Sequence, residues 1–509
     1  MHETSKTSYD EVPYESFPIP LAQPDRLATL ARLAGLKPAA LETCRVLELG
    51  CAAGGNLIPM AIELPGAQFV GVDLSAVQVA EGDAVIRALG LGNVRLIGSS
   101  LTDLDDSLDR FDYVIAHGLY SWVPNAVQDK LLEVCSRNLA PTGIAYVSYN
   151  TLPGWHMRGM IRDAMRYRAM QFTEPDKRIA QARAMLDFLA RAVPDETSPY
   201  AQLLRAELEL LRRAPDYYIF HEHLEELNEP VYFHQFMQHA ARHGLQYLAD
   251  ADLANAPTTR FPMQVADAVH AMARDRIEEE QFGDFLVNRT FRQSLLTHAD
   301  QPIDRTVTPQ RVKDLWLASG ARPSSAKPNL AEGAIERFCT PAGMCVNVPR
   351  SITKCALVTL AARWPAAVPF DDVLASAYSR LRPLAGKSPS EEEVNTLCSD
   401  LMYCFAAGIA ELHAGDSPFR VEPGERPQAS PLARHQSPRG PRISTLRHES
   451  IPVPEPIRAL LPLLDGSRTI EEIGAAATAP GAAASGKFAN TAAVKDAIDQ
   501  IARNALILR

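Results

Sequence analysis

A turn of small residues, Gly50–Gly55, directly follows a short apolar run that ends at Leu49. Small residues at such a turn let the backbone approach a ligand closely. Asp73 ends the next apolar run, where a carboxylate can accept hydrogen bonds from both ribose hydroxyls of an adenosine. These residue types and spacings predict an adenosine-containing cofactor at one edge of a sheet.

Two cofactors fit this turn, and its glycine count does not separate them. Whether the turn is aligned to G-x-G-x-x-G or to E-x-G-x-G-x-G, one glycine is missing because Ala52 stands in its place. Glu48 favours a methyl donor over a nicotinamide dinucleotide, since a carboxylate there would repel a pyrophosphate but can orient a cationic methionyl group. The turn lies on the first strand of the fold, and Phe111–Ile115 supplies a fourth. The predicted cofactor is S-adenosylmethionine (SAM); the alternative is a turn that only packs a helix.

The elements that must position this turn alternate along the first 150 residues. Alternating strands and helices, with strands that are apolar throughout, predict an α/β fold with a doubly wound parallel sheet. Helices are expected at 75–89 and 124–139, with Ser75 as a cap. After residue 160 the strand signal fades, and the chain reads as mostly helical up to residue 413. The expected strands are 45–50, 69–74, 94–98, 111–116 and 143–148.

Composition narrows the function classes. Of the 509 residues, 51 are Lys or Arg and 61 are Asp or Glu, which gives a net charge of −10. A nucleic-acid binder is therefore disfavoured, and the arginine-rich stretch 418–447 is expected to pack against the body of the protein. No apolar run approaches the roughly 20 residues of a membrane span. Eight scattered cysteines without a C-x-x-C pair predict reduced thiols and a cytoplasmic protein.

Longer motifs then give the turn a family context. Together they resemble bacterial class I SAM-dependent methyltransferases that carry a methyltransferase regulatory domain and a C-terminal winged helix. Ala52 is typical of that group, and the resemblance covers nearly all of the chain. Its best understood members are lysine methyltransferases that act on outer-membrane proteins. The motifs are residues 8–14, 50–61, 117–124, 148–158, 221–228, 284–293 and 429–434.

The resemblance implies four domains and a set of cofactor contacts. A Rossmann-like, SAM-binding domain would span 1–160, a helical regulatory and dimerisation domain 161–305, a helical middle domain 306–415 and a winged helix 416–509. Glu48, Gly50 and Gly54 would line the methionyl part of SAM, and Asp73 would hold the ribose. The full set of implied cofactor contacts is Tyr14, Glu48, Gly50, Cys51, Gly54, Asp73, Leu74, Ser100, Leu101, His117 and Gly118.

The acceptor side is expected where strands four and five end. Methyl transfer from a sulfonium releases a neutral thioether, so the enzyme mainly aligns the nucleophile and excludes water. A lysine acceptor must also lose a proton, because its pKa is ordinarily about 10.4; an aromatic-lined, desolvated channel and a nearby base would help. Candidate catalytic residues are His117, Tyr120, Trp122 and Asn150. The alternatives are interdomain packing for the tryptophan and a structural, backbone-bonded role for His117.

Histidines between residues 221 and 243 raise the question of a metal. His239 and His243 would share one helix face. His221-Glu222 begins like a zinc-protease motif, but Glu225 replaces its second histidine and no cysteine is close. We therefore expect no metal, and interpret these histidines as a helix surface that makes interdomain hydrogen bonds.

The leading hypothesis is thus a cytoplasmic SAM-dependent methyltransferase that acts on protein lysines. A protein or peptide acceptor is the expected partner, without membrane insertion, and the resemblance suggests a homodimer through the helical region. Three rival hypotheses stay open: a small-molecule methyltransferase, a SAM-binding scaffold without turnover, and a transcription regulator that uses the winged helix.

Overall fold

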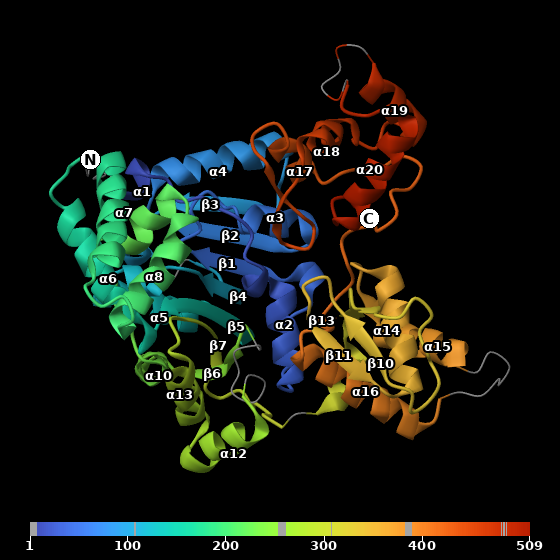
Figure 1. Ribbon diagram of the computed structural model, residues 1–509, viewed down its shortest axis with the longest axis horizontal. Coiled ribbons are helices and arrows are strands. Elements are labelled where there is room, and N and C mark those ends of the chain that lie inside the picture. Colours follow the sequence, from blue (N-terminus) through green and yellow to red (C-terminus); the bar gives the residue numbers. More distant parts are fainter. Residues whose placement is uncertain are drawn as a thin grey trace.

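The computed structural model describes residues 8–105, 108–252, 261–306, 308–381, 389–479, 481, 484 and 486–509. Figure 1 shows a central sheet with the helical region (green) at one end. The middle domain (yellow to orange) and the C-terminal domain (red) lie toward the other end, beside α2 and α3. Among the described residues, no helix is long and apolar enough to cross a membrane.

The central sheet has seven strands in the order β3-β2-β1-β4-β5-β7-β6. The first five run parallel and confirm the expected doubly wound α/β fold. Residues alternate between its faces, so that Val46 enters one apolar core and Leu47 the other. The strands are β1 (Arg45–Leu49), β2 (Gln68–Asp73), β3 (Val94–Gly98), β4 (Phe111–Ala116), β5 (Leu139–Asn150), β6 (Leu245–Asp250) and β7 (Phe291–His298).

Two of the helices that flank this sheet, α4 and α5, begin and end near the predicted bounds 75–89 and 124–139. Ser75 caps α4 by accepting a hydrogen bond from the Gln78 N–H, as expected. Pro124 precedes α5 as its cap residue instead of lying in its first turn. The flanking helices are α2 (Pro24–Leu33), α3 (Leu57–Glu63), α4 (Ala76–Leu89), α5 (Asn125–Arg137) and α10 (Phe233–Arg242).

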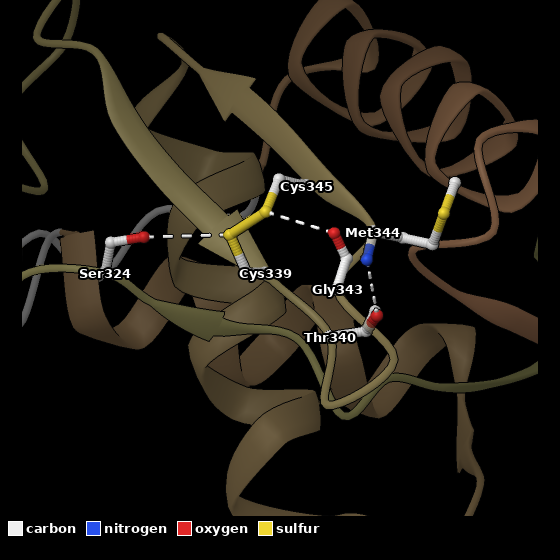
Figure 2. Close-up of a disulfide and its surroundings, with 6 residues drawn as sticks. All are labelled: Ser324, Cys339, Thr340, Gly343, Met344 and Cys345. Carbon is white, nitrogen blue, oxygen red and sulfur yellow. Dashed lines mark hydrogen bonds between the residues drawn. A yellow bond between two sulfur atoms is a disulfide. The ribbon is translucent and has the colours of Figure 1, made fainter.

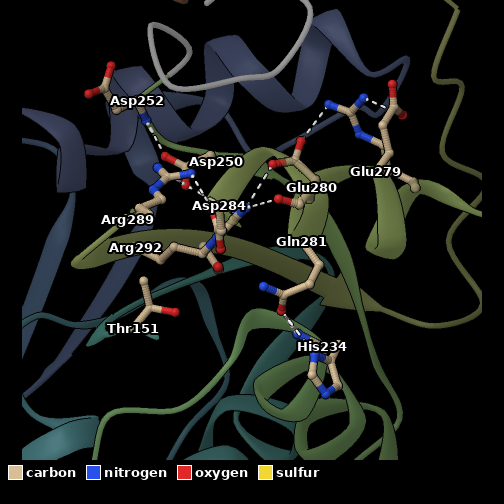
Figure 3. A network of polar contacts seen from close by, with 12 residues as sticks. Thr151, His234, Asp250, Asp252, Glu279, Glu280, Gln281, Asp284, Arg289 and Arg292 are labelled. Carbon is tan, nitrogen blue, oxygen red and sulfur yellow. Dashed lines mark hydrogen bonds and ion pairs between the residues drawn. The ribbon is translucent and has the colours of Figure 1, made fainter. Parts of the chain in front are cut away.

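Strands β6 and β7 correct the reading of residues 161–305 as helical. β7 pairs antiparallel with both β5 and β6, so the sheet extends into the expected regulatory domain. Arg292 on β7 is fully buried, which hides the apolar signature of a core strand. Its guanidinium pairs with Asp284 at 2.7 Å and Glu280 at 3.0 Å (Figure 3). Arg289 and Arg292 thus form internal ion pairs with acidic residues of β6 and α13.

Apart from β6 and β7, the described elements between residues 151 and 305 are helices. α6, α7 and α8 pack around an apolar cluster that includes Ile161, Leu186 and Phe220. A π-helical turn, η5 (Ile219–Leu224), follows α9. The helices are α6 (Gly154–Ala169), α7 (Pro175–Ala192), α8 (Pro199–Arg212), α9 (Asp216–Tyr218), α12 (Met263–Met272) and α13 (Arg276–Val287); α1 (Ser8–Glu11) lies at the start of the described chain.

The middle domain mixes helices with two small sheets. Its helices are α14 (Ser351–Arg363), α15 (Phe370–Leu381) and α16 (Glu391–Ala406). One sheet has the order β11-β10-β9 and the other β12-β8-β13. The strands are β8 (Trp316–Ala318), β9 (Arg322–Pro323), β10 (Glu336–Cys339), β11 (Cys345–Val348), β12 (Val368–Pro369) and β13 (Glu411–His413).

One pair of cysteines contradicts the prediction of reduced thiols throughout. Cys339 and Cys345 form a disulfide across the β10–β11 hairpin (Figure 2). The antiparallel register sets these two residues opposite each other, which their sequence spacing alone does not reveal. The other six cysteines are free and buried.

The C-terminal domain surrounds its own apolar core. Its elements are α17 (Pro431–Gln436), β14 (Arg442–Ser444), β15 (Ser450–Pro452), α18 (Glu455–Leu460), α19 (Ile470–Thr478) and α20 (Thr491–Arg503). The stretch 418–447 is ordered and carries α17 and β14, as expected. The β14–β15 hairpin reaches back to the other domains.

Candidate active site

A cavity of about 700 Å³ lies where the parallel strands end. Loops after β1, β2, β3 and β4 form one half, which we call the cofactor half. Residues of α6, α9, η5 and the adjoining Glu225, with Tyr14 from the N-terminal segment and Trp122 after β4, form the acceptor half. Of the predicted cofactor contacts, all except Gly54 line this cavity: Tyr14, Glu48, Gly50, Cys51, Asp73, Leu74, Ser100, Leu101, His117 and Gly118.

The carboxylate of Asp73 fixes the small-residue turn through a hydrogen bond. One Asp73 carboxylate oxygen accepts the N–H of Ala52 at 2.7 Å, and the other accepts the N–H of Ser75 at 2.8 Å. Gly50, Ala52 and Gly54 have φ values of +75°, +49° and +72°. Asp73 therefore fixes both the turn and the start of α4 while its carboxylate lines the cavity.

Gly54 has a different position from the one the resemblance implied. It does not line the cavity, and a Cβ there would approach Leu96 and Ile58 at 3.3–3.4 Å. Its positive φ shapes the turn, since left-handed backbone is costly for residues with a Cβ. Gly54 therefore shapes the turn, and its contact with the cofactor stays a prediction.

Glu48 provides a test of whether the cavity fits SAM. Its carboxyl is 3% exposed, and Oε1 accepts a 2.8 Å hydrogen bond from Asn56 Nδ2. Oε2 is buried without a hydrogen-bond partner in the described part of the chain. Burial raises the pKa of Glu48 to about 8, against the Asn56 hydrogen bond, which lowers it. A buried carboxylate with an unused oxygen fits the cationic amino group of the methionyl end.

The remaining cofactor loops are short and polar at the expected adenine side. Ser100 caps the next short helical turn, because its hydroxyl accepts the N–H of Thr102. Leu101 is buried in the cavity wall, and Leu74 lies at the exposed rim. Leu101 thus offers an apolar surface to an aromatic ring, while Ser100 offers a hydroxyl instead of an acid.

The imidazole of His117 lies beside two hydroxyl groups. Its Nδ1 lies 2.9 Å from the Tyr146 hydroxyl and 3.3 Å from the Ser148 hydroxyl. Both hydroxyls already accept N–H groups, from Gln293 and Gly118 respectively. Each hydroxyl keeps its own proton for donation, and donation to Nδ1 is compatible with a ring proton on Nε2. Burial lowers the pKa of His117 to about 4. A group with so low a pKa is a weak base near neutral pH, which disfavours His117 as a general base.

The other predicted catalytic residues divide into two groups. Trp122 and Asn150 line the cavity. Trp122 packs edge-on against Trp155, and Asn150 Nδ2 donates to Asn228 Oδ1 at 2.9 Å. Tyr120 is 2% exposed and lies outside the cavity wall, where its hydroxyl bonds His239 Nδ1 at 2.8 Å. The structure therefore gives Tyr120 a packing position instead of a catalytic one.

The acceptor half contains residues that sequence reasoning missed. His221 is buried, so its reading as a helix-surface residue is wrong. Its Nδ1 contacts Glu225 at 2.9 Å and its Nε2 contacts the Val12 carbonyl at 2.6 Å. Glu222 also lines the cavity, and burial raises its pKa to about 7. Burial would also raise the pKa of Glu225, but hydrogen bonds, largely from His221, bring it below its ordinary value.

Aromatic rings surround these carboxyls. Tyr14 lies 5.0 Å from the Tyr217 ring and 5.6 Å from His221, measured between ring centroids. Tyr218 and Trp122 also line the cavity. The acceptor half therefore combines two carboxyl groups with aromatic walls.

Comparisons with known proteins agree with this architecture. Three family models match: a methyltransferase domain at 46–143, a predicted methyltransferase regulatory domain at 215–298, and the C-terminal winged helix domain of PKMT at 425–506. PKMT denotes protein lysine methyltransferase. The solved structure of PKMT2 from Rickettsia typhi in complex with AdoHcy superposes with a TM-score of 0.85 at 31% identity. The match covers 98% of this chain and 100% of that one. The chain belongs to the PKMT family.

This PKMT-family chain is therefore a class I SAM-dependent methyltransferase. Curated relatives come from Rickettsia prowazekii: the uncharacterized protein RP789 is 48% identical over 305 residues, and RP028 is 43% identical over 240 residues. These matches cover 60% and 47% of this chain, and 55% and 96% of the respective relatives. The chain thus spans about half the length of RP789.

In this PKMT-family chain, the regulatory region and the methyltransferase core meet at His239 and His243. Both Nε2 atoms contact the same Asp129 oxygen, at 3.1 and 2.9 Å. His239 lies on α10 and His243 is the C-cap residue of that helix, so both rings reach Asp129 on α5, and the expected common side is confirmed. No sequence pattern indicated Asp129, because it is more than 100 residues distant from both histidines. In this arrangement the cluster joins the regulatory region to the methyltransferase core.

Proposed function

We propose that this chain transfers the methyl group of SAM to lysine side chains of protein acceptors. The observation that supports it is the acceptor half of the cavity, where Glu222 and Glu225 lie among aromatic rings in the same cavity as Glu48. Carboxylates attract an ammonium group, and aromatic faces stabilise it in a desolvated site. A carboxylate-poor, apolar acceptor half would have suited a neutral small molecule better.

The chain's own residues account for the chemistry that a lysine requires. SAM supplies a methyl group on a sulfonium, which leaves as a neutral thioether. Desolvation between Tyr14, Tyr218 and Trp122 lowers the pKa of the incoming amine. Glu222, whose pKa is raised to about 7, is the proposed proton acceptor, because a base works best with a pKa near the working pH. Glu225, fixed by His221, holds the charge of the ammonium before it is deprotonated.

The decisive experiment uses labelled SAM and a panel of unfolded and surface-exposed proteins, with mass spectrometry to identify the modified residue. Label on lysine is the expected result. Glu222→Gln should abolish most of the transfer, whereas Glu226→Gln, an exposed acid nearby, should leave it intact. Absence of label on any protein would contradict the proposal. Label confined to low-mass fractions would select a small-molecule methyltransferase.

Two further proposals follow from the family resemblance. We propose that the protein is cytoplasmic and forms a homodimer through its helical region. Exposed apolar side chains on this region support the second proposal, because single-chain proteins rarely expose such clusters. Light scattering of the native protein and of Tyr167→Glu tests it, with dissociation expected in the variant. The exposed side chains are Met160, Tyr167, Met170, Phe188 and Leu210.

A further inference from the structure

The tip of the β14–β15 hairpin brings three neighbouring residues to three different domains. Leu446 stays within the C-terminal domain, where its N–H donates to the Ala505 carbonyl. Arg447 enters the middle domain, with Glu411 at 2.9 Å and the Trp364 ring 4.6 Å from its guanidinium carbon. His448 enters the methyltransferase domain. The tip therefore joins all three units within a few residues.

His448 is built into the methyltransferase domain. Its side chain is fully buried, and its backbone has a φ of +60°, uncommon for a residue with a Cβ. Nε2 lies 2.7 Å from Asn56 Oδ1, and Nδ1 lies 3.2 Å from Glu63 Oε1. Both contacts are oxygen acceptors, so each ring nitrogen has a partner for a donated hydrogen bond.

Asn56 has only one orientation that satisfies its neighbours. Its Oδ1 accepts the backbone N–H of Ile19 at 2.9 Å as well as the His448 contact. A backbone N–H can only donate, so a flipped amide would set two donors against each other. Nδ2 must therefore point the other way, and it donates to Glu48 Oε1 at 2.8 Å. The orientation of Asn56 decides which oxygen of Glu48 stays unused.

We propose that His448 is a positioning residue of the SAM site, which holds Asn56 so that Asn56 orients Glu48 toward the methionyl end of the cofactor. The C-terminal domain is then a structural part of the cofactor site, in addition to any role in acceptor recognition. The inference rests on SAM as cofactor in the proposed function, but not on the identity of the acceptor.

The chain offers a matched control for mere domain docking. Arg447 lies next to His448 on the same tip and bonds Glu411 with two hydrogen bonds, but it does not touch Asn56. If the hairpin only fastened the domains together, loss of either side chain would have similar effects. If His448 positions Glu48, its loss alone weakens SAM binding.

The experiment measures SAM binding to the full chain by calorimetry, with thermal unfolding of each variant as a folding check. His448→Ala should weaken SAM binding about tenfold, since a lost hydrogen bond to an ionised group has an effect of that size. Asn56→Ala should do the same, and the double variant should add little. Arg447→Gln should stay within about twofold of the native protein. Equal effects of His448→Ala and Arg447→Gln, or no effect of His448→Ala, would overturn the proposal.

A pH profile separates positioning from packing. The titratable groups that face Glu48 are Asp73, Cys51 and Tyr146. Loss of the Asn56 hydrogen bond should raise the pKa of Glu48, so in His448→Ala the pH midpoint of SAM binding moves upward. His448→Gln, whose amide can still donate to Asn56, should restore both affinity and midpoint. If His448→Ala does not fold, His448→Gln replaces it as the test variant. A folded His448→Gln whose pH midpoint is not restored would contradict the positioning role of His448.

This test is independent of the acceptor. A native protein that binds SAM but labels no protein would contradict the proposed lysine acceptor and leave the role of His448 standing. A native protein that labels lysines, with SAM binding unchanged in His448→Ala, would do the opposite.

Discussion

The two halves of the cavity hold their carboxyl groups in different ways. In the cofactor half, both oxygens of Asp73 accept backbone N–H groups at 2.7 and 2.8 Å. In the acceptor half, Glu225 is held by the imidazole of His221, which itself bonds the carbonyl of Val12. The first half thus depends on backbone N–H groups of Ala52 and Ser75. The second depends on the His221 side chain, which links Glu225 to the N-terminal segment that carries Val12.

This difference indicates how each half responds to change. A site fixed by backbone groups keeps its shape when the surrounding domains shift. A site fixed by side chains from docked helices changes with the docking. Glu48 lies in the cofactor half, which backbone groups fix. Its own orientation nevertheless depends on side chains, because Asn56 and His448 hold it.

The largest effect should come from Asp73, on which the cofactor half depends. In Asp73→Ala the turn and the start of α4 each lose a hydrogen bond to the carboxylate, and the ribose loses its expected acceptor. We expect SAM affinity to fall more than about 100-fold, which corresponds to roughly 3 kcal/mol. Calorimetry checks this, with Glu81→Ala, an exposed acid on α4, as the control. Retained affinity in Asp73→Ala would mean that the turn holds itself, and the comparison between the halves would fail.

The next largest effect should come from Glu222 in the acceptor half. Glu222→Gln should lower kcat about 100-fold, a typical size for loss of a general base, with SAM affinity unchanged. Because burial raises the pKa of Glu222 to about 7, the native rate should fall as pH drops below that value. Single-turnover methylation across pH tests this. A Glu222→Gln rate that keeps the native pH dependence would assign the titration to another group.

The same contrast explains what the sequence could predict. Strands β1–β5 were predicted because each is a short apolar run, and the small-residue turn because its residues are consecutive. β7 was missed because Arg292 interrupts its apolar pattern, and the ion pairs that bury it come from α13. His221 was assigned to a surface because nothing local indicates that η5 turns inward. Asn56 and His448 are 392 residues apart, so only the fold brings them together.

A smaller effect concerns pH and domain docking. Burial would lower the pKa of His413, but contacts with Asp25 and Glu411 raise it to about 9. The stability from this pairing is full below the ordinary value of 6.5 and is lost as pH rises through about 9. We expect the free energy of unfolding to fall by about 2 kcal/mol over that range. Denaturant titrations should show this loss in the native protein and not in His413→Gln.

SAM binding should change in the opposite direction over much of the same range. The pKa of Glu48 is raised to about 8, and the ionised carboxylate is the form that attracts a cationic amino group. Affinity should therefore rise with pH while stability falls. If SAM affinity and the free energy of unfolding instead fell together as pH rises, domain docking would control the cofactor half as well.

The smallest effect tests the turn itself. Ala52 has a φ of +49°, a left-handed conformation that costs residues with a Cβ roughly 1 kcal/mol. Ala52→Gly should remove this cost, although glycine also gains freedom in the unfolded chain, so the net gain in unfolding free energy should stay below about 1 kcal/mol. Ala53→Gly, at a neighbouring position without positive φ, should only destabilise. Calorimetric SAM affinity should stay within about twofold in both variants, because the Ala52 N–H that bonds Asp73 is kept. A large change in affinity would show that the Ala52 methyl group, and not only the backbone, shapes the cofactor half.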